Sequence, residues 1–555
     1  MSRRSRILWT TLGLVVALGV AAWATFDDVL LRFPGWLSRM RDPIGENRPV
    51  VWAQGPSEPT APPNERPPNV VVILVDDLGW NDLTFGGGGV ADGAVPTPNI
   101  DSIAHDGVEF THGYAGNATC APSRAAIMTG RYPTRFGFEF TPAPKAFMRL
   151  IAYMNRDQLR PPIYFEDREK DVPELEKQGL PPDEITLAEL LKKQGYHTLG
   201  IGKWHLGETP AMAPEARGFD EYLGFLQGAA LFLPVGDPRG VESVQEFDPI
   251  DKFLWANLPF AVRKDGGPRF EPSTYMTDYL ADEAVSAIAA NRNRPFFLYL
   301  AFNAPHTPLQ ALREDYDALP QIEDHALRVY AAMIRSLDRS IGRVLAALRE
   351  NGLEENTLVL FTSDNGGANY IGLPDINHPY RGWKMTFFEG GVHMPFFARW
   401  PAKLAKGTRF DPPVGHVDIF ATAAGAAGAA LPSDRVYDGV DLTALVRGEP
   451  DARSRKVQFW RSGHYRAVLA DGWKLQVSER PAKVWLFDLA TDPDEKTNLA
   501  DARPDKRAEL EAILAEQEAQ MVKPAWPALI EGPIAIDHPL DVPDRPDDEY
   551  VYWAN

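Results

Sequence analysis

Four short segments dominated by apolar residues recur through the middle of the chain, and polar or charged side chains follow each of them. They cover residues 69–75, 197–201, 296–302 and 357–362. Apolar runs of this kind are typical of strands buried on both faces of a parallel sheet. Capping residues and helical periodicity predict helices at 98–106, 187–195, 277–291 and 325–349. The alternation predicts an α/β domain with a large central, mostly parallel sheet flanked by helices.

The pattern changes after about residue 445. A smaller antiparallel sheet is predicted by short apolar runs, separated by turns, at 456–460, 465–469, 473–477 and 484–489. Residues 505–521 predict a helix, and the Pro- and Asp-rich end of the chain predicts an extended surface tail. We therefore expect a main domain at 68–445, a C-terminal α+β subdomain at 446–523 and a tail at 524–555.

The start of the chain predicts a signal peptide or signal anchor over residues 1–25. Basic residues precede an uncharged apolar run from Ile7 to Ala24, which is the pattern of an export signal. The small residues Ala22 and Ala24 favour cleavage, but the run is close to the roughly 20 residues that span a bilayer, so membrane anchoring through residues 7–24 is the alternative. Residues 26–67 predict a linker that begins with a short amphipathic helix at 26–40. We expect a periplasmic or extracellular protein.

Composition and charge narrow the function further. The chain has 555 residues, a hydrophobic share of 44% and a charged share of 24%, as expected for a globular protein of two or three domains. Its net charge of −19 argues against binding to nucleic acid, which requires a basic face. The single cysteine cannot form an internal disulfide, a cysteine-based zinc site or an iron–sulfur cluster.

That cysteine opens the most specific segment of the sequence, Cys120-Ala-Pro-Ser-Arg124-Ala-Ala-Ile-Met-Thr-Gly130. Pro122 suits the first turn of a helix that begins at Cys120, where free N–H groups favour an anion and lower the pKa of a thiol. Arg124 lies one turn further and points back to the same end. The segment predicts a pocket for an anionic group, and a buried, inert cysteine is the structural alternative.

The segment resembles the signature of the type I sulfatases, which have an alkaline-phosphatase-like fold. A second segment, Gly195-Tyr-His-Thr-Leu-Gly-Ile-Gly-Lys203-Trp-His205, is similar to the other family motif. The resemblance extends from about residue 68 to 498 and includes Asp76-Asp77-Leu-Gly-Trp, Ser363-Asp-Asn-Gly-Gly and Glu389-Gly-Gly-Val-His393. It implies that Cys120 is oxidised to formylglycine (3-oxoalanine) by a maturation enzyme. The sequence departs from the family pattern at His393, where an arginine is expected.

Oxygen-bearing side chains predict a metal site at the strand ends. Asp76, Asp77, Asp364 and Asn365 offer hard oxygen ligands, which select calcium or magnesium over zinc. Read alone, the aspartates could cap a helix and Ser363-Asp-Asn-Gly-Gly could form a turn. The resemblance implies one Ca²⁺ ion, held by these four residues and by the formylglycine at position 120.

The resemblance also implies roles in hydrolysis of a sulfate monoester by a hydrated formylglycine. It assigns Arg124 to holding the formylglycine and His205 to a proton of its gem-diol. Lys203 and Lys384 would bind sulfate oxygens, and His306 would be the general acid. Without the resemblance, the two histidines could be packed strand-end or loop residues, and Lys384 a surface lysine.

Two other functions compete with sulfate ester hydrolysis. A formylglycine-dependent phosphonate or phosphate ester hydrolase would share the motif, although a nearly dianionic phosphate monoester would want more positive charge or a second metal. A non-catalytic binder would result if Cys120 stayed unmodified. The substrate is expected to be a sulfated small molecule or glycan, with sulfated carbohydrate favoured by analogy alone. Residues 136–182 and 231–269 are expected to shape the rim, and Asn117-Ala-Thr119 to be a pocket loop.

Overall fold

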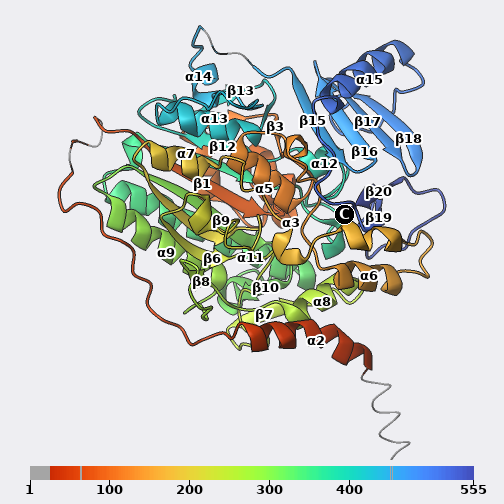
Figure 1. Ribbon diagram of the computed structural model, residues 1–555, viewed down its shortest axis with the longest axis horizontal. Coiled ribbons are helices and arrows are strands. Elements are labelled where there is room, and N and C mark those ends of the chain that lie inside the picture. Colours follow the sequence, from red (N-terminus) through yellow and green to blue (C-terminus); the bar gives the residue numbers. More distant parts are fainter. Residues whose placement is uncertain (1–25, 60, 63–64, 451, 453) are drawn as a thin grey trace, which may run out of the picture.

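A nine-stranded mixed sheet forms the centre of the molecule (Figure 1), in a computed structural model that describes residues 26–59, 61–62, 65–450, 452 and 454–555. From edge to edge its strands are β13 (Thr408–Phe410), β2 (Val108–Phe110), β12 (Phe396–Arg399), β11 (Thr357–Ser363), β1 (Asn69–Asp76), β9 (Phe296–Pro305), β5 (His197–Lys203), β6 (Glu221–Phe225) and β8 (Arg263–Lys264). The strands from β11 to β6 run parallel, whereas β12 and β8 are antiparallel to their inner neighbours. The predicted large, mostly parallel sheet is confirmed.

The four predicted strands are β1, β5, β9 and β11, and they lie next to one another in the order β11-β1-β9-β5. The structure extends each of them by one to three residues beyond the predicted end. Because all four are parallel, their carboxyl ends meet at one edge of the sheet. The polar residues that follow them are therefore brought together there, where open α/β sheets bind ligands.

Helices cover both faces of the sheet, and each face has its own hydrophobic core. Alternate residues of β1 point to opposite sides, so that Val71 and Ile73 enter one core while Val70 and Val72 enter the other. The first core is covered by α4 (Pro98–His105), α9 (Met276–Asn291) and α11 (His325–Glu350). The second is covered by α5 (Cys120–Thr129), α7 (Leu187–Lys193) and α13 (Val417–Ala426). The four helices predicted between the strands are confirmed, and the capping box at Thr186 is present.

The predicted smaller antiparallel sheet is also confirmed, and Figure 1 shows it in blue beside the central sheet. Its strands are β15 (Val457–Ser462), β16 (Tyr465–Ala470), β17 (Trp473–Glu479) and β18 (Ala482–Asp488), and α15 (Pro504–Glu518) packs against them. Its side chains share a core with the main domain, since Phe387 and Phe388 pack with Trp460 and Trp485.

The prediction of an extended tail for residues 524–555 is wrong. The segment forms β19 (Ile530–Ala535) and β20 (Tyr550–Ala554), which pair with each other and, through β19, with β4 (Ile163–Tyr164). Trp526, Val551 and Trp553 are buried. The Pro- and Asp-rich stretch that suggested a tail is only the loop between the two strands, whereas the apolar residues on either side of it form a sheet.

Two helices from separate parts of the chain, α6 (Lys145–Met154) and α8 (Pro249–Asn257), are in contact with each other. The helix predicted at 26–40 is present as α2 (Phe26–Arg41) and packs on α8. Part of the predicted linker is packed too, because Trp52 is buried and its Nε1 donates a hydrogen bond to Glu283. The signal or anchor predicted at 1–25 lies outside the described residues. Among helices built from the described residues, none combines the length and the apolar composition needed to cross a membrane.

Candidate active site

The ten residues predicted for the site all lie at the carboxyl edge of the central sheet, within one buried cluster. Asp76 ends β1 and Asp77 follows it, Lys203 ends β5 and His205 comes two residues later, His306 follows β9, and Asp364 and Asn365 follow β11. Cys120 and Arg124 come from the first turns of α5, and Lys384 comes from the loop after β11. Four separate strand ends, one helix and one loop therefore supply the cluster.

Helix α5 begins at Cys120, as the sequence predicts. Thr119 before it is extended, Pro122 lies in the first turn, and Gly130 ends the helix in the left-handed conformation (φ 66°). Arg124 reaches back toward the strand ends: its Nε donates to Asp364 Oδ2 at 2.9 Å and its Nη1 donates to the carbonyl of Lys203 at 3.1 Å. The arginine thus ties the helix to both β5 and β11.

Cys120 faces the first pair of carboxylates. Its Sγ lies 3.6 Å from Asp76 Oδ1 and 3.9 Å from Asp77 Oδ1. Ligand atoms of Asp76, Asp77, Cys120 and His306 all lie within 4.8 Å of one another, which is the spacing of groups that share one ion. Asn365 joins the group through a hydrogen bond of 2.7 Å from its Nδ2 to Asp77 Oδ1.

An orphaned polar atom supports a metal ion at this cluster. Asn365 Oδ1 is buried and has no hydrogen-bond partner among the described residues. A buried carbonyl oxygen without a partner costs roughly 1–3 kcal/mol, and a bound cation would remove that cost. The neighbouring ligands are carboxylates, so the donor set fits a hard divalent ion.

Each cation of the cluster is paired with an aspartate. Lys203 Nζ lies 2.6 Å from Asp76 and Lys384 Nζ lies 2.7 Å from Asp77, while Arg124 Nη2 lies 2.8 Å from Asp364. Burial raises the pKa of Asp77, but the nearby Lys384 and His306 outweigh it and hold that pKa below its usual value. Burial together with the charge of Asp76 raises the pKa of Asp364 to about 6. Three aspartates of the buried cluster are thus matched by three cationic side chains.

The prediction that the helix N-terminus lowers the pKa of the Cys120 thiol is wrong. Burial and the neighbouring Asp364 raise that pKa to about 12, against the smaller opposing effect of Lys203. Only 3% of the residue is exposed. Desolvation and the carboxylates therefore outweigh the helix dipole, and position 120 is a poor site for a thiolate nucleophile.

The two histidines differ in their surroundings. His306 Nδ1 lies 2.6 Å from the carbonyl of Thr307, an acceptor that requires a proton on Nδ1, and its Nε2 lies 3.6 Å from Asp77. His205 Nδ1 is buried without a partner among the described residues, and burial lowers the pKa of His205 well below its usual value. A Cβ at Gly228 would stand 2.9 Å from the His205 ring, so this position accommodates only glycine without a shift.

Three residues at or beside the cluster have a strained backbone. Asp77, His205 and Met385 have φ values of 61°, 59° and 68°, in the left-handed region that non-glycine residues rarely adopt. Such a conformation costs on the order of 1–3 kcal/mol and persists only where surrounding contacts enforce it. Here it aims the side chains of Asp77 and His205 into the cluster.

The sequence reasoning missed Tyr370. Its hydroxyl donates to Asp77 Oδ2 at 2.9 Å and accepts from Lys384 Nζ at 3.0 Å, so it bridges a predicted ligand and a predicted cation. Only its position shortly after Ser363-Asp-Asn-Gly-Gly could have pointed to it. His393, which departs from the family pattern, faces away: its ring bonds Glu389 at 2.8 Å and the carbonyl of Thr111 at 2.9 Å.

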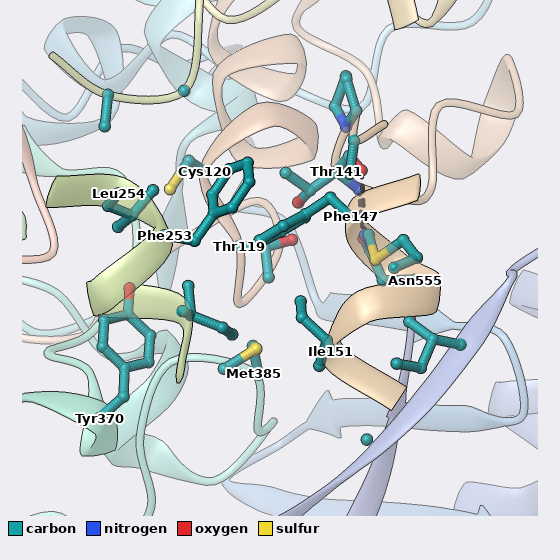
Figure 2. A pocket seen from close by; sticks show the side chains of 18 of the residues that line it. Thr119, Cys120, Thr141, Phe147, Ile151, Phe253, Leu254, Tyr370, Met385 and Asn555 are labelled. Carbon is teal, nitrogen blue, oxygen red and sulfur yellow. Dashed lines mark hydrogen bonds between the residues drawn. The ribbon is translucent and has the colours of Figure 1, made fainter. Parts of the chain in front are cut away.

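A cavity of about 500 Å³ opens above the cluster (Figure 2). Cys120, His205, His306 and Lys384 line it at the inner end. Both segments predicted to shape the rim contribute, through α6 and α8, and Thr119 confirms that the predicted pocket loop lines the cavity. The C-terminal strands were not predicted to take part, yet Ile534 and Trp553 also line it.

Comparisons with known proteins agree with this geometry. The family model described as Sulfatase matches residues 68–429. The steryl-sulfatase of Mus musculus is 32% identical over 575 residues, which cover 85% of this chain and 85% of the relative. The N-acetylgalactosamine-6-sulfatase of Rattus norvegicus is 35% identical over 77% of this chain and 74% of the relative.

Solved structures give the same result. Ps i-CgsB in complex with k-i-k-neocarrahexaose is 30% identical with a TM-score of 0.68, and the match covers 83% of this chain and 95% of that chain. The PsFucS1 sulfatase from Pseudoalteromonas sp. is 26% identical with a TM-score of 0.62, over 82% of this chain and 90% of that chain. The phosphonate monoester hydrolase of Agrobacterium radiobacter is 20% identical with a TM-score of 0.57, over 82% of this chain and 96% of that chain, and shares the fold.

Proposed function

The chain belongs to the sulfatase family and hydrolyses sulfate esters, and from that premise we propose that it does so with formylglycine derived from Cys120 and one Ca²⁺ ion. The observation that carries the proposal is the buried group of Asp76, Asp77 and Cys120 beside the orphaned Asn365 Oδ1. Formylglycine, once formed, would supply a hydrated aldehyde as the nucleophile toward sulfur.

The ion would be held by Asp76, Asp77, Asp364 and Asn365 together with residue 120. Bound there, it would offset the charge of the sulfate oxygens. Arg124 would keep residue 120 oriented, since its guanidinium is fixed by Asp364 and the carbonyl of Lys203. Lys203 and Lys384, the two ammonium groups of the cluster, would bind sulfate oxygens.

The histidines would move the protons. His306 carries its Nδ1 proton toward Thr307, which leaves Nε2 to exchange a proton with the leaving alcohol oxygen. Nδ1 of His205, which has no partner among the described residues and lines the same cavity as Cys120, would take a proton from the residue at position 120. Burial and the nearby cations lower the pKa of His205, which keeps this ring neutral and able to act as a base.

Mass spectrometry and kinetics test the proposal together. Protein from the native host should carry formylglycine at position 120 and should cleave 4-nitrophenyl sulfate. Cys120→Ala should abolish turnover, and a chelator should reduce it until Ca²⁺ is restored. An unmodified Cys120 would favour a non-catalytic binder. Higher kcat/KM on 4-nitrophenyl phosphate than on the sulfate would favour the phosphate ester alternative.

We also propose that the protein is exported and that a maturation enzyme oxidises Cys120. The support is the basic and apolar pattern of residues 1–25. Cell fractionation with N-terminal sequencing of the mature protein tests it, and distinguishes a cleaved signal from a membrane anchor. Full-length protein recovered from the cytoplasm would contradict export.

The names of the relatives leave two substrate classes open. One is a steryl-sulfatase and another is an N-acetylgalactosamine-6-sulfatase. We therefore propose a sulfated small molecule or a sulfated glycan as the substrate, and the cavity itself bears on the choice.

A further inference from the structure

The wall of the cavity beyond its inner end is almost entirely hydrocarbon. Helix α6 contributes Phe147 and Ile151, and α8 contributes Phe253 and Leu254. Figure 2 shows these four side chains gathered around the cavity, with Met385 on another side. The rings of Phe147 and Phe253 lie 4.6 Å apart between centroids, so the two helices form one continuous apolar roof.

Several polar side chains in the wall are already bonded to the protein. Gln178 exchanges hydrogen bonds with the backbone of Ala143, at 2.9 and 3.1 Å. Asn555 does the same with the backbone of Thr141, at 2.7 and 3.1 Å. Asp248 accepts from two backbone N–H groups at the start of α8. These groups hold the wall together and have little capacity left for a ligand.

The apolar part of the cavity under α6 and α8, called the chamber below, would bind a sugar with an unfavourable free energy. Each hydroxyl that leaves water without a new hydrogen bond costs roughly 1–3 kcal/mol. The polar partners that remain are Thr141 Oγ1, which is buried without a partner among the described residues, the side-chain amide of Asn369, and the Glu208–Gln227 pair, joined at 3.0 Å. These groups could meet a few hydroxyls, but the hydrocarbon of α6 and α8 would leave the other hydroxyls of a pyranose without partners.

We propose that the sulfate ester cleaved here carries a bulky apolar group, a long alkyl chain or a fused-ring alcohol, which fills the chamber under α6 and α8. The inference rests on the proposed function, since it takes the inner end of the cavity as the sulfate site. Apolar surface buried against these walls would supply most of the binding free energy, while Lys384 and the histidines would fix the sulfate end.

A binding series tests the substrate class without requiring formylglycine. Butyl, hexyl and octyl sulfate, kept below micelle formation, are titrated by calorimetry into Ca²⁺-loaded Cys120→Ala protein. Each buried methylene should lower the Kd by up to about fourfold, which gives on the order of 100-fold between butyl and octyl sulfate. The heat capacity change should become more negative with chain length. Equal Kd values along the series, or tighter binding of N-acetylgalactosamine 6-sulfate than of octyl sulfate, would overturn the inference.

A matched pair of variants tests whether the alkyl chain binds against the roof formed by α6 and α8. Ile151→Asn, in the Cys120→Ala background, should raise the Kd of octyl sulfate about tenfold and the Kd of butyl sulfate less than twofold. Val235→Asn makes a similar change at an exposed aliphatic residue outside the cavity lining and should change neither Kd. Leu254→Asn replaces Ile151→Asn if the latter does not fold. A loss of equal size for both ligands would contradict binding of the chain in the roof.

Kinetics of the matured wild-type protein distinguish failure of the proposed catalytic function from failure of the proposed substrate class. If 4-nitrophenyl sulfate is not cleaved, the proposed catalytic function fails. If it is cleaved but octyl sulfate has a kcat/KM no better than butyl sulfate or N-acetylgalactosamine 6-sulfate, only the substrate inference fails. We expect octyl sulfate to exceed the sugar sulfate by at least 100-fold.

Discussion

Arg124 and Asp364 form a fully buried ion pair at the site, with neither side chain exposed to solvent. Removing one partner of a buried pair leaves an uncompensated charge and costs about 3–5 kcal/mol, whereas removing both leaves none. We expect Arg124→Ala to destabilise the protein by that amount, and the double variant Arg124→Ala/Asp364→Ala to lose less than the sum of the singles.

Chemical denaturation in the presence of a chelator measures this cycle. The exposed pair Arg503–Asp505, at 3.0 Å, is the control and should show no measurable coupling. Additive single losses at Arg124 and Asp364 would contradict the role of the pair.

Asp82 should make stability depend on pH. Its carboxylate is buried; Oδ2 accepts from Gly79 and Tyr330, whereas Oδ1 has no partner among the described residues. Burial raises its pKa from 3.8 to about 7. The folded state therefore binds the proton more tightly, and stability falls as pH rises from about 4 to 7. Ionised above pH 7, the group costs roughly 4 kcal/mol.

The variant Asp82→Asn removes that cost. It should raise the Tm relative to wild type at pH 8 and lose the advantage at pH 4. Asp183→Asn, at an exposed aspartate, should leave the pH profile unchanged. If the difference in Tm between Asp82→Asn and wild type is constant from pH 4 to pH 8, Asp82 does not titrate in this range.

Among individual residues, the sequence predicted those whose type the chemistry requires. It did not predict the properties that depend on three-dimensional packing. Asp76 and Asp364 could be found because oxygen ligands directly follow buried strands. Tyr370 could not, since it lies in a single 3-10 turn, Asn369–Ile371, where no spacing marks a functional tyrosine. The raised pKa of Cys120 depends on burial and on Asp364, which is far away in the sequence.

Helix α2 is held against α8 by a close backbone approach at Gly35. A Cβ there would lie 2.9 Å from Asn257 Cα, and the Gly35 N–H donates to Asn257 Oδ1 at 2.6 Å. Gly35→Val should therefore separate α2 from α8. Hydrogen exchange should show faster exchange in residues 249–257, and binding of octyl sulfate should weaken because α8 forms part of the roof.

Ser38→Val, at an exposed position of the same helix, is the matched control and should leave both readouts unchanged. If hydrogen exchange in residues 249–257 of Gly35→Val is as slow as in wild type, α2 does not stabilise α8.

Among the elements, long and regular segments were predictable and short ones were not. The strands β1, β9 and β11 and the helices α9 and α11 follow from uninterrupted apolar runs or clear periodicity. The strands β2, β12 and β13, on one side of the central sheet, have three or four residues each, too few for a pattern. The strands β19 and β20 were missed because the Pro- and Asp-rich loop between them dominates the composition.

The main domain and the C-terminal sheet form one cooperative unit, because they share their cores. Ala126 of α5 packs in the same cluster as Phe459 and Leu475, and Trp460 Nε1 donates to the carbonyl of Ala115 at 2.8 Å. The predicted boundary at residue 445 therefore does not separate two independent units. A chain ending at residue 445 should be insoluble or unfolded.

Circular dichroism and soluble yield measure the truncation. The control is the full chain with a protease site inserted after Gly448, cleaved once it has folded: its two fragments should remain together on gel filtration. A folded, soluble 1–445 fragment would contradict the shared core.

The apolar chamber also bears on what happens after the ester bond is broken. Sulfate leaves as a hydrated ion, but the alcohol keeps all of its contacts with α6 and α8 and loses only its charged end. Its dissociation should slow with each added carbon, until product departure rather than chemistry limits turnover. Such an enzyme would capture dilute, long-chain esters efficiently and work slowly when they are abundant, and inhibition by its own product would grow with chain length.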